Sequence, residues 1–256
     1  MNTLKISKKE KYIVVQLDRG KANVINQEMV DELRELITNA ENDDNIGGIV
    51  LTGKPHFFSG GVDLLEVYYY TSEQIRKFWG SFLLLATEMI AFSKPLVASI
   101  TGHSPAGGCI LACACDYRVM AKGEKYKIGL NEIAVGIAPR QSIMQLYSFL
   151  IGKRKAYQFL LEGYLMSPKE ALEFGLVDQL TELNETLSIA EAKIQQYLSF
   201  PTKAFMQTKK ALKKELLTQM KLNFEENLDI LHKQLMSEES RIIMGKVVDF
   251  LNAKKN

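Results

Sequence analysis

The 256-residue sequence predicts an α/β fold followed by an all-helical C-terminal region, and three observations predict it. Short, almost entirely apolar runs at residues 47–54 and 96–100 are typical of strands that are buried on both faces. Each run is followed by a glycine-rich elbow and then by the start of a helix. From about residue 186 onward only helical periodicity remains. We therefore expect a core of repeated strand–strand–helix units over residues 1–185 and a helical region over residues 186–256.

The composition narrows the classes of function. The chain is 46% hydrophobic and 24% charged, which is ordinary for a soluble globular protein. A formal charge of +2 gives no reason to expect nucleic acid or an anionic membrane as a partner. No apolar run approaches the ~20 residues needed to span a bilayer. The N-terminus lacks the apolar stretch of a signal peptide, so we expect a cytoplasmic protein.

Three cysteines, Cys109, Cys113 and Cys115, cluster after the second elbow. An odd number gives no disulfide framework, and the spacing is not that of a zinc site. The nearest histidine, His103, lies on the other side of the elbow. We interpret the cysteines as small core residues and expect no metal.

The sequence of the first half of the chain predicts one further strand and three helices, in the following order. Residues 11–17 alternate as a strand does, and residues 27–43 have the apolar face of an amphipathic helix. A second helix is expected over about residues 72–91. A third begins near Ala106 and leads into another apolar run.

The second half is increasingly helical. Helices are expected over residues 142–151 and 153–165, followed by a helix with Ser167 as N-cap, Pro168 at its first position and Gly175 at its end. Residues 176–180 form a last short strand. A long helix is then expected over about residues 202–236, with breaks at Pro201 and Ser237. Its apolar stripe requires a packing partner, either the chain's own core or another subunit: Leu217, Met220, Phe224, Leu228, Leu231 and Leu235.

The two elbows suggest a site for negative charge. They read SGGVD at residues 59–63 and PAGGC at residues 105–109. A chain that turns through adjacent glycines into a helix leaves backbone N–H groups without intrahelical acceptors. Two such groups converging on one oxygen make an oxyanion hole, which stabilises an enolate or a tetrahedral intermediate.

A base is also needed, and Glu132 is the candidate. It follows an apolar run and lies among Leu130, Asn131 and Ile133. Apolar surroundings raise the pKa of a carboxyl group and suit it to act as a general base. On position alone, however, a solvated surface turn is the favoured interpretation. The three histidines have no evident carboxylate partner, and no GxSxG or Cys–His arrangement indicates covalent catalysis.

Several motifs in a fixed order carry a family resemblance. They are HFFSGGVDLLE, ITGHSPAGGCILACACDYRV, YKIGLNE, LEGYLMSPKEALEFGLVDQL and SEESRIIMGKVVDFLNAKK. Over about residues 10–253 the chain resembles the crotonase (enoyl-CoA hydratase/isomerase) superfamily. The resemblance implies a spiral core of ββα units with a C-terminal helical trimerisation region, and hence a homotrimer or a dimer of trimers.

The resemblance also implies the substrate and the residues that bind it. The substrate is an acyl-CoA whose thioester oxygen lies between the N–H groups of Val62 and Gly107. Coenzyme A is part of the substrate, so no separate cofactor is expected. The residues implied to line the CoA and substrate groove are Lys21, Ala22, Asn23, Ser59, Gly61, Asp63, Leu64 and Gly108.

One departure from the family pattern bears on the reaction. The family's hydratases use two glutamates, one directly after the Gly-Gly-Cys and one at the position of Glu132, whereas here the first position is Ile110. Hydration needs a group to orient and deprotonate water, but a double-bond shift needs one base that moves a proton from C2 to C4. The motifs are most similar to those of mitochondrial-type Δ3,Δ2-enoyl-CoA isomerases, which keep the single glutamate. This implies an isomerase of fatty acid β-oxidation.

Alternatives remain open at this point. The chain could catalyse another reaction of the family, such as hydration, or act on a polar acyl group reached by Arg140. It could also bind acyl-CoA without catalysis. The lysines at 209, 210, 213 and 214 could contact CoA phosphates, although a solvated helix face is favoured. The aromatic residues at 68–70, 79 and 82 could border the acyl tunnel or belong to the core.

Overall fold

The computed structural model describes residues 1–253. Its centre is a six-stranded sheet in the order β1-β2-β3-β5-β7-β9, in which β1 and β2 are antiparallel and the other neighbours are parallel. A second sheet of three short parallel strands has the order β4-β6-β8. The strands of the first sheet are β1 (Leu4–Lys8), β2 (Ile13–Leu17), β3 (Ile49–Thr52), β5 (Leu96–Ile100), β7 (Tyr117–Ala121) and β9 (Gln179–Thr181). Those of the second are β4 (His56–Phe57), β6 (Gly102–Pro105) and β8 (Ile128–Gly129).

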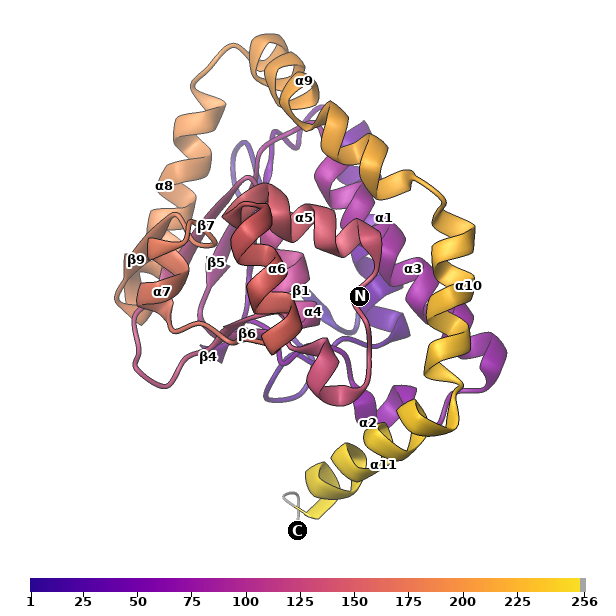
Figure 1. Ribbon diagram of the computed structural model, residues 1–256. Coiled ribbons are helices and arrows are strands. Elements are labelled where there is room, and N and C mark those ends of the chain that lie inside the picture. Colours follow the sequence, from indigo (N-terminus) through magenta and orange to yellow (C-terminus); the bar gives the residue numbers. More distant parts are fainter. Residues whose placement is uncertain (254–256) are drawn as a thin grey trace.

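The chain forms a spiral, because each turn adds one strand to each sheet and then a helix. Strands β3 and β4 precede the helices α2 and α3, and strands β5 and β6 precede α4. Strands β7 and β8 precede the short 3-10 helix η1 and then α5. This confirms the predicted core of ββα units (Figure 1).

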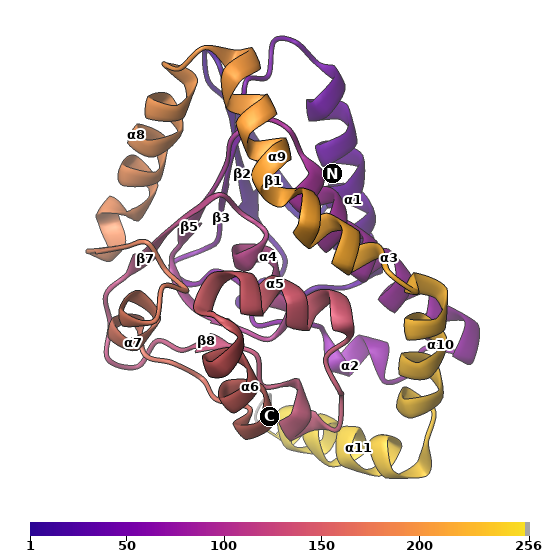
Figure 2. The same ribbon diagram turned by 45° about the horizontal axis from the view of Figure 1, so that its top comes forward.

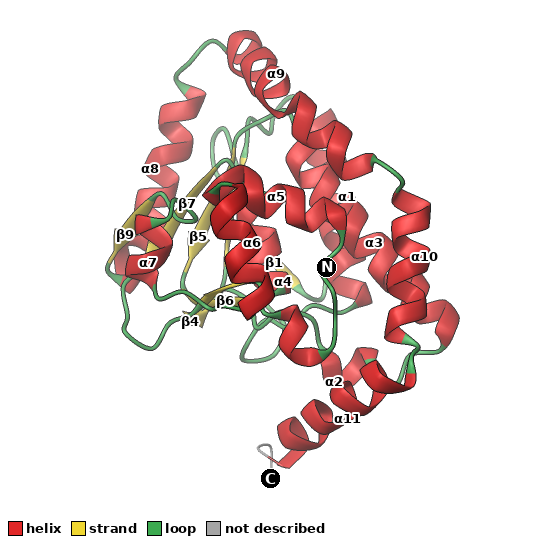
Figure 3. Cartoon of the chain, in the orientation of Figure 1, coloured by secondary structure: helices red, strands yellow, loops and turns green. Residues whose placement is uncertain are grey.

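Helices form the outer layers (Figures 1 and 3). Successive side chains of a strand point to opposite faces, so Val50 and Val97 pack against α8 while Ile49 and Leu51 face the larger core that includes α1 and α3. The helices are α1 (Gln27–Asn42), α2 (Leu64–Val67), α3 (Ser72–Ala91), α4 (Gly107–Cys113), η1 (Glu132–Val135), α5 (Gln141–Ile151), α6 (Lys153–Glu162), α7 (Pro168–Glu173), η2 (Leu183–Glu185), α8 (Thr186–Leu198), α9 (Thr202–Lys221), α10 (Phe224–Leu235) and α11 (Glu238–Ala253).

The C-terminal helices follow one another around the outside of the spiral, and Figures 1 and 2 show them as an arm from α8 to α11. The prediction of one long helix over residues 202–236 is wrong, because this segment forms two helices, α9 and α10. Leu222 is extended and Asn223 adopts the left-handed conformation (φ 52°), which asparagine tolerates better than most residues. The last three residues of the predicted helical region, 254–256, lie outside the described part of the chain.

A buried ion cluster fastens α9 to the sheet. The Nζ atoms of Lys209 and Lys213 each lie 2.6 Å from a carboxylate oxygen of Asp116, which also accepts a hydrogen bond from the backbone N–H of Leu96. Both lysines are buried, so the solvated-face interpretation is wrong for them, although Lys210 and Lys214 are exposed. No helix within residues 1–253 is long and apolar enough to cross a membrane.

Candidate active site

The first elbow places the N–H of Val62. Val62 forms a parallel bridge with Ile25, in which the N–H of Ile25 donates to the oxygen of Gly61 (2.8 Å) and the N–H of Asp63 donates to Ile25 (2.9 Å). Because the flanking residues make both hydrogen bonds, the N–H of Val62 itself is left for a ligand. Gly61 has φ +85°, a conformation that strongly favours glycine.

The second elbow brings the N–H of Gly107 to the same place. Gly107 is the first residue of α4, and its N–H has no intrahelical acceptor because of that position. A Cβ atom built on Gly107 would lie 3.3 Å from the nitrogen of Val62, and one built on Gly61 would lie 3.5 Å from the nitrogen of Gly107. The two donors therefore border one small space, as an oxyanion hole requires.

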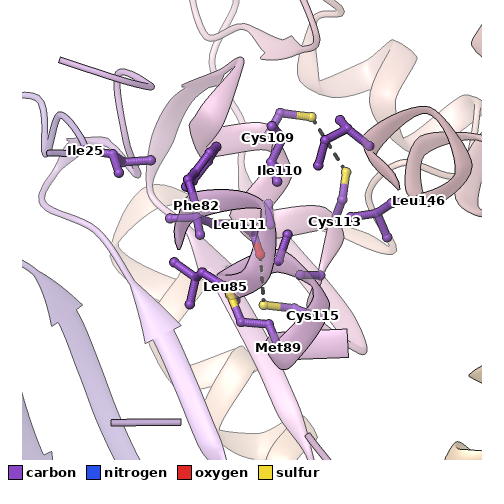
Figure 4. Close-up of a cluster of buried hydrophobic side chains, with 14 of the residues drawn as sticks. Ile25, Phe82, Leu85, Met89, Cys109, Ile110, Leu111, Cys113, Cys115 and Leu146 are labelled. Carbon is purple, nitrogen blue, oxygen red and sulfur yellow. Dashed lines mark hydrogen bonds between the residues drawn. The ribbon is translucent and has the colours of Figure 1, made fainter. Parts of the chain in front are cut away.

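Helix α4 is held rigidly because all of its residues are buried. Figure 4 shows Phe82, Leu85 and Met89 of α3 packed around it. The sulfur atoms of Cys109 and Cys113 lie 3.7 Å apart, and Cys115 donates to the oxygen of Leu111 at 3.4 Å. All three thiols are free and buried, as the interpretation as core residues predicts. Within residues 1–253 no group of three or more His, Cys, Asp or Glu is arranged to hold a metal ion.

Glu132 begins η1, and its side chain is buried with 6% of the residue exposed. The solvated-turn interpretation is therefore wrong. Its Oε2 atom has no hydrogen-bond partner among the described residues. Removal from water disfavours the charged form, and this burial raises the pKa of Glu132 to about 7. A carboxyl group with this pKa can take up and release a proton near neutral pH.

Glu132 and both elbows line one cavity of about 120 Å³. Its walls are otherwise mostly apolar, and Ile110 is one of the residues that line it. Trp79 and Phe82 line the cavity, whereas Tyr68, Tyr69 and Tyr70 do not. The remaining lining residues are Gly60, Leu64, Pro105, Ala106, Asn131, Val135 and Ile137. A larger cavity of about 530 Å³ lies between α5, α8 and α9, away from these groups, so size alone does not mark the reaction site.

Two of the predicted groove residues shape the loop before α1 rather than facing the cavity. Asn23 is buried with φ +49°, and its amide donates to the oxygens of Phe57 (3.1 Å) and Phe58 (3.2 Å). The hydroxyl of Ser59 donates to the oxygen of Asn23 and accepts from the N–H of Gly61. They hold the first elbow in shape.

The other predicted groove residues are more dispersed. Lys21 is exposed, and the oxygen of Ala22 accepts from the N–H of Gly60 at 2.7 Å. Leu64 lines the cavity. A Cβ atom on Gly108 would lie 2.6 Å from the oxygen of Ser59, so the close approach of the two elbows requires glycine there.

Asp63 has a structural partner that the sequence did not indicate. Its carboxylate caps α2 by accepting from the N–H groups of Leu65 (3.1 Å) and Glu66 (3.3 Å). Arg19 lies 2.6 Å from Asp63 and 2.7 Å from Glu66, bridging both carboxylates. This network fixes the residue next to Val62, so Arg19 helps to hold the backbone around the N–H of Val62.

Arg140 and the three histidines do not line the cavity that contains Glu132. The guanidinium of Arg140 donates to Asn227 of α10 (3.2 Å) and does not line the cavity with Glu132. His56 pairs with the hydroxyl of Tyr126 (2.6 Å), and His232 with Ser72. The geometry thus offers one base and two backbone donors.

The raised pKa of Glu132 makes stability depend on pH. The folded pKa of about 7 exceeds the ordinary value of 4.5, so the folded state holds the proton more tightly. Stability therefore falls as the pH rises from 4.5 through 7, in total by about 3 kcal/mol. Glu132→Gln removes this penalty, and we expect the variant to be more stable than wild type by about that amount at pH 8.5. Urea unfolding at pH 5 and pH 8.5 measures it. If the difference in unfolding free energy between Glu132→Gln and wild type does not shrink toward pH 5, the raised pKa of Glu132 is wrong.

Comparison with known sequences gives consistent matches. The family model for enoyl-CoA hydratase/isomerase matches residues 7–255. The mouse protein named enoyl-CoA delta isomerase 1, mitochondrial, is 37% identical over 202 residues, which cover 78% of this chain and 70% of that protein. Its human counterpart is 30% identical over 239 residues, covering 91% and 79%. A probable enoyl-CoA hydratase of Mycobacterium tuberculosis is 29% identical over 191 residues, covering 74% and 73%.

Solved structures agree. The human mitochondrial delta3-delta2-enoyl-CoA isomerase superposes with a TM-score of 0.95 at 27% identity, covering 99% of this chain and 100% of that one. An enoyl-CoA hydratase from Mycobacterium ulcerans superposes with a TM-score of 0.81 at 25% identity, covering 91% and 99%. The human isomerase is thus matched over more of this chain than the Mycobacterium ulcerans hydratase is.

Proposed function

The chain belongs to the enoyl-CoA hydratase/isomerase family, and on that premise we propose that it is a Δ3,Δ2-enoyl-CoA isomerase acting in fatty acid β-oxidation. One observation carries the proposal. Among the described residues, Glu132 is the one carboxylate that lines the cavity joining the two backbone donors, and the apolar side chain of Ile110 lines it as well. A lone base beside an oxyanion hole can move a proton but has no partner with which to orient water.

The proposed reaction needs two proton transfers by the same group. The thioester oxygen of a 3-enoyl-CoA accepts from the N–H groups of Val62 and Gly107. The carboxylate of Glu132 removes a proton from C2, and the electron pair moves into the thioester to give a dienolate. Glu132 then returns the proton to C4 while the oxyanion reforms the carbonyl. The double bond has moved from C3 to C2, and no proton is gained or lost.

A direct assay separates this function from its alternatives. The purified protein is offered a 3-enoyl-CoA, and the absorbance of the conjugated 2-enoyl thioester is followed. The isomerase is expected to produce that absorbance and to leave a 2-enoyl-CoA unhydrated. Loss of absorbance from a 2-enoyl-CoA would favour a hydratase. Binding of either compound without any change would favour a silent acyl-CoA binder.

The pH dependence follows from the ionisation of the base. Glu132 must be a carboxylate to accept the C2 proton, and its pKa in the free protein is about 7. We expect kcat/KM to fall about tenfold per pH unit below pH 7 and to level off above it. Initial rates between pH 5.5 and pH 9 measure this. A profile that stays flat down to pH 5.5 would assign the base elsewhere.

We also propose that the protein works as a homotrimer or a dimer of trimers and needs no metal or separate cofactor. Apolar side chains are exposed on α5, α6 and α9, with Phe149 51%, Leu161 60% and Leu212 70% exposed, and contact with other subunits would cover them. The need for no cofactor follows from the chemistry, since Glu132 carries the proton in both steps.

A further inference from the structure

The turn that carries Glu132 is held by the C-terminal helices. Gly136 ends η1 in the left-handed conformation (φ +75°), and its oxygen accepts from the Ser240 hydroxyl of α11 (3.0 Å) and the Gln234 amide of α10 (3.3 Å). The same Gln234 side chain accepts from the N–H of Ala138 at 3.2 Å. Three hydrogen bonds from side chains about a hundred residues along the chain therefore converge on this turn.

The turn transmits its position directly to the base. The N–H of Ile137 donates to the oxygen of Glu132 (3.0 Å), and the N–H of Gly136 donates to Ile133 (3.2 Å). Within residues 1–253 the Oε2 atom of the Glu132 carboxylate has no hydrogen-bond partner. The place of this carboxyl group is consequently set by its backbone, so a displacement of the Gly136 carbonyl displaces the base.

Helix α11 is attached to the oxyanion half of the site as well. The guanidinium of Arg241 lies 4.0 Å from the centre of the Tyr68 ring, and a Cβ atom on Gly245 would lie 3.0 Å from the Tyr68 hydroxyl. Tyr68 ends α2, whose N-cap, Asp63, is the neighbour of Val62. Figures 1 and 2 show α11 beside α2. One helix thus contacts both the segment that bears an oxyanion donor and the segment that bears the base.

We propose that Gln234 and Ser240 are positioning residues that set the place of Glu132 relative to the oxyanion hole. This role rests on the proposed isomerase function. A single carboxyl group must reach C2 in the first step and C4 in the second while the thioester oxygen stays fixed. A displacement of about 1 Å can cost on the order of a hundredfold in rate. The hydrogen bonds from Gln234 and Ser240 hold the carboxyl group of Glu132 where it can reach both C2 and C4.

The test is the double variant Gln234→Ala/Ser240→Ala. We expect kcat to fall about 10- to 100-fold, with KM within about twofold of wild type, since the acyl-CoA groove is untouched. The decisive readout is the partition of the intermediate. In D₂O, deuterium that exchanges onto the protonated Glu132 is carried to C2 of recovered 3-enoyl-CoA or to C4 of the 2-enoyl product. The ratio of the two reports return to C2 against delivery to C4. A displaced base changes this ratio, whereas partial unfolding lowers both processes equally.

Matched variants keep the outcome unambiguous. Ser240→Thr retains the hydroxyl donor and should lie closer to wild type than Ser240→Ala. Lys233→Ala changes an exposed neighbour of Gln234 on α10 and should match wild type. If the folded double variant keeps the wild-type kcat, or loses kcat with an unchanged partition ratio, the positioning role is wrong and the isomerase function stands. If wild type itself moves no double bond, the proposed function fails and the positioning role fails with it.

Discussion

Glu132→Gln is expected to lower the rate of the double-bond shift by about 10⁴-fold while leaving acyl-CoA binding intact. The amide has nearly the same shape as the carboxyl group but cannot accept the C2 proton. General base catalysis contributes about 10²–10⁴ to a rate, and we expect the upper end because this group acts in both steps. Single-turnover rates with a 3-enoyl-CoA and calorimetric titration with a saturated acyl-CoA measure the two quantities separately.

A second glutamine variant serves as its control. Glu124 is exposed and lies eight residues before Glu132, so Glu124→Gln makes the same chemical change outside the cavity. It should retain the wild-type rate. Wild-type-like turnover by Glu132→Gln would remove this residue from the mechanism, and loss of acyl-CoA binding would show that its role is structural.

Gly107→Ala should have the next largest effect. The added Cβ atom would lie 3.3 Å from the nitrogen of Val62 and 3.1 Å from the Cδ1 atom of Ile25. It would enter the space between the two N–H groups to which we assign the thioester oxygen. Loss of one oxyanion donor costs about 10²–10³ in kcat, and we expect a decrease of that size. Steady-state kinetics with a 3-enoyl-CoA measure it.

Gly80→Ala is a suitable control for crowding. Gly80 lies in α3, and its Cβ atom would come 3.1 Å from a methyl group of Leu228, away from the cavity. This variant has a similar steric conflict but leaves both donors untouched. If Gly107→Ala is no slower than Gly80→Ala, the oxyanion hole has been assigned to the wrong backbone groups.

Elements with a clear period could be predicted from the sequence, and the very short ones could not. The N-cap of α7 is confirmed, since Ser167 and Glu170 form a capping box with Pro168 behind the cap. The strands β4 and β6 of the small sheet have two and four residues, too few for an alternating pattern. Strand β1 was missed because only Leu4 is buried and the rest of this edge strand is exposed.

In the site, too, local sequence patterns could be predicted, whereas contacts between residues far apart in the sequence could not. Glycine pairs and a carboxylate after an apolar run are local signals, and they led to Val62, Gly107 and Glu132. The ion pair of Arg19 with Asp63 spans 44 residues, and the contact of Gln234 with Gly136 spans 98. No local pattern marks such contacts. The burial of Glu132 is likewise produced by distant segments that close over it.

The reactivity of the buried cysteines around α4 depends on whether this helix stays packed in the core. Burial raises the pKa of Cys109 well above its usual range and that of Cys115 to about 12, so neither thiol is reactive while the helix is in place. A reagent can reach Cys109 only when α4 leaves the core, and that movement also carries Gly107 away from Val62. Chemical exposure of this sulfur and separation of the N–H groups of Gly107 and Val62 are therefore a single event.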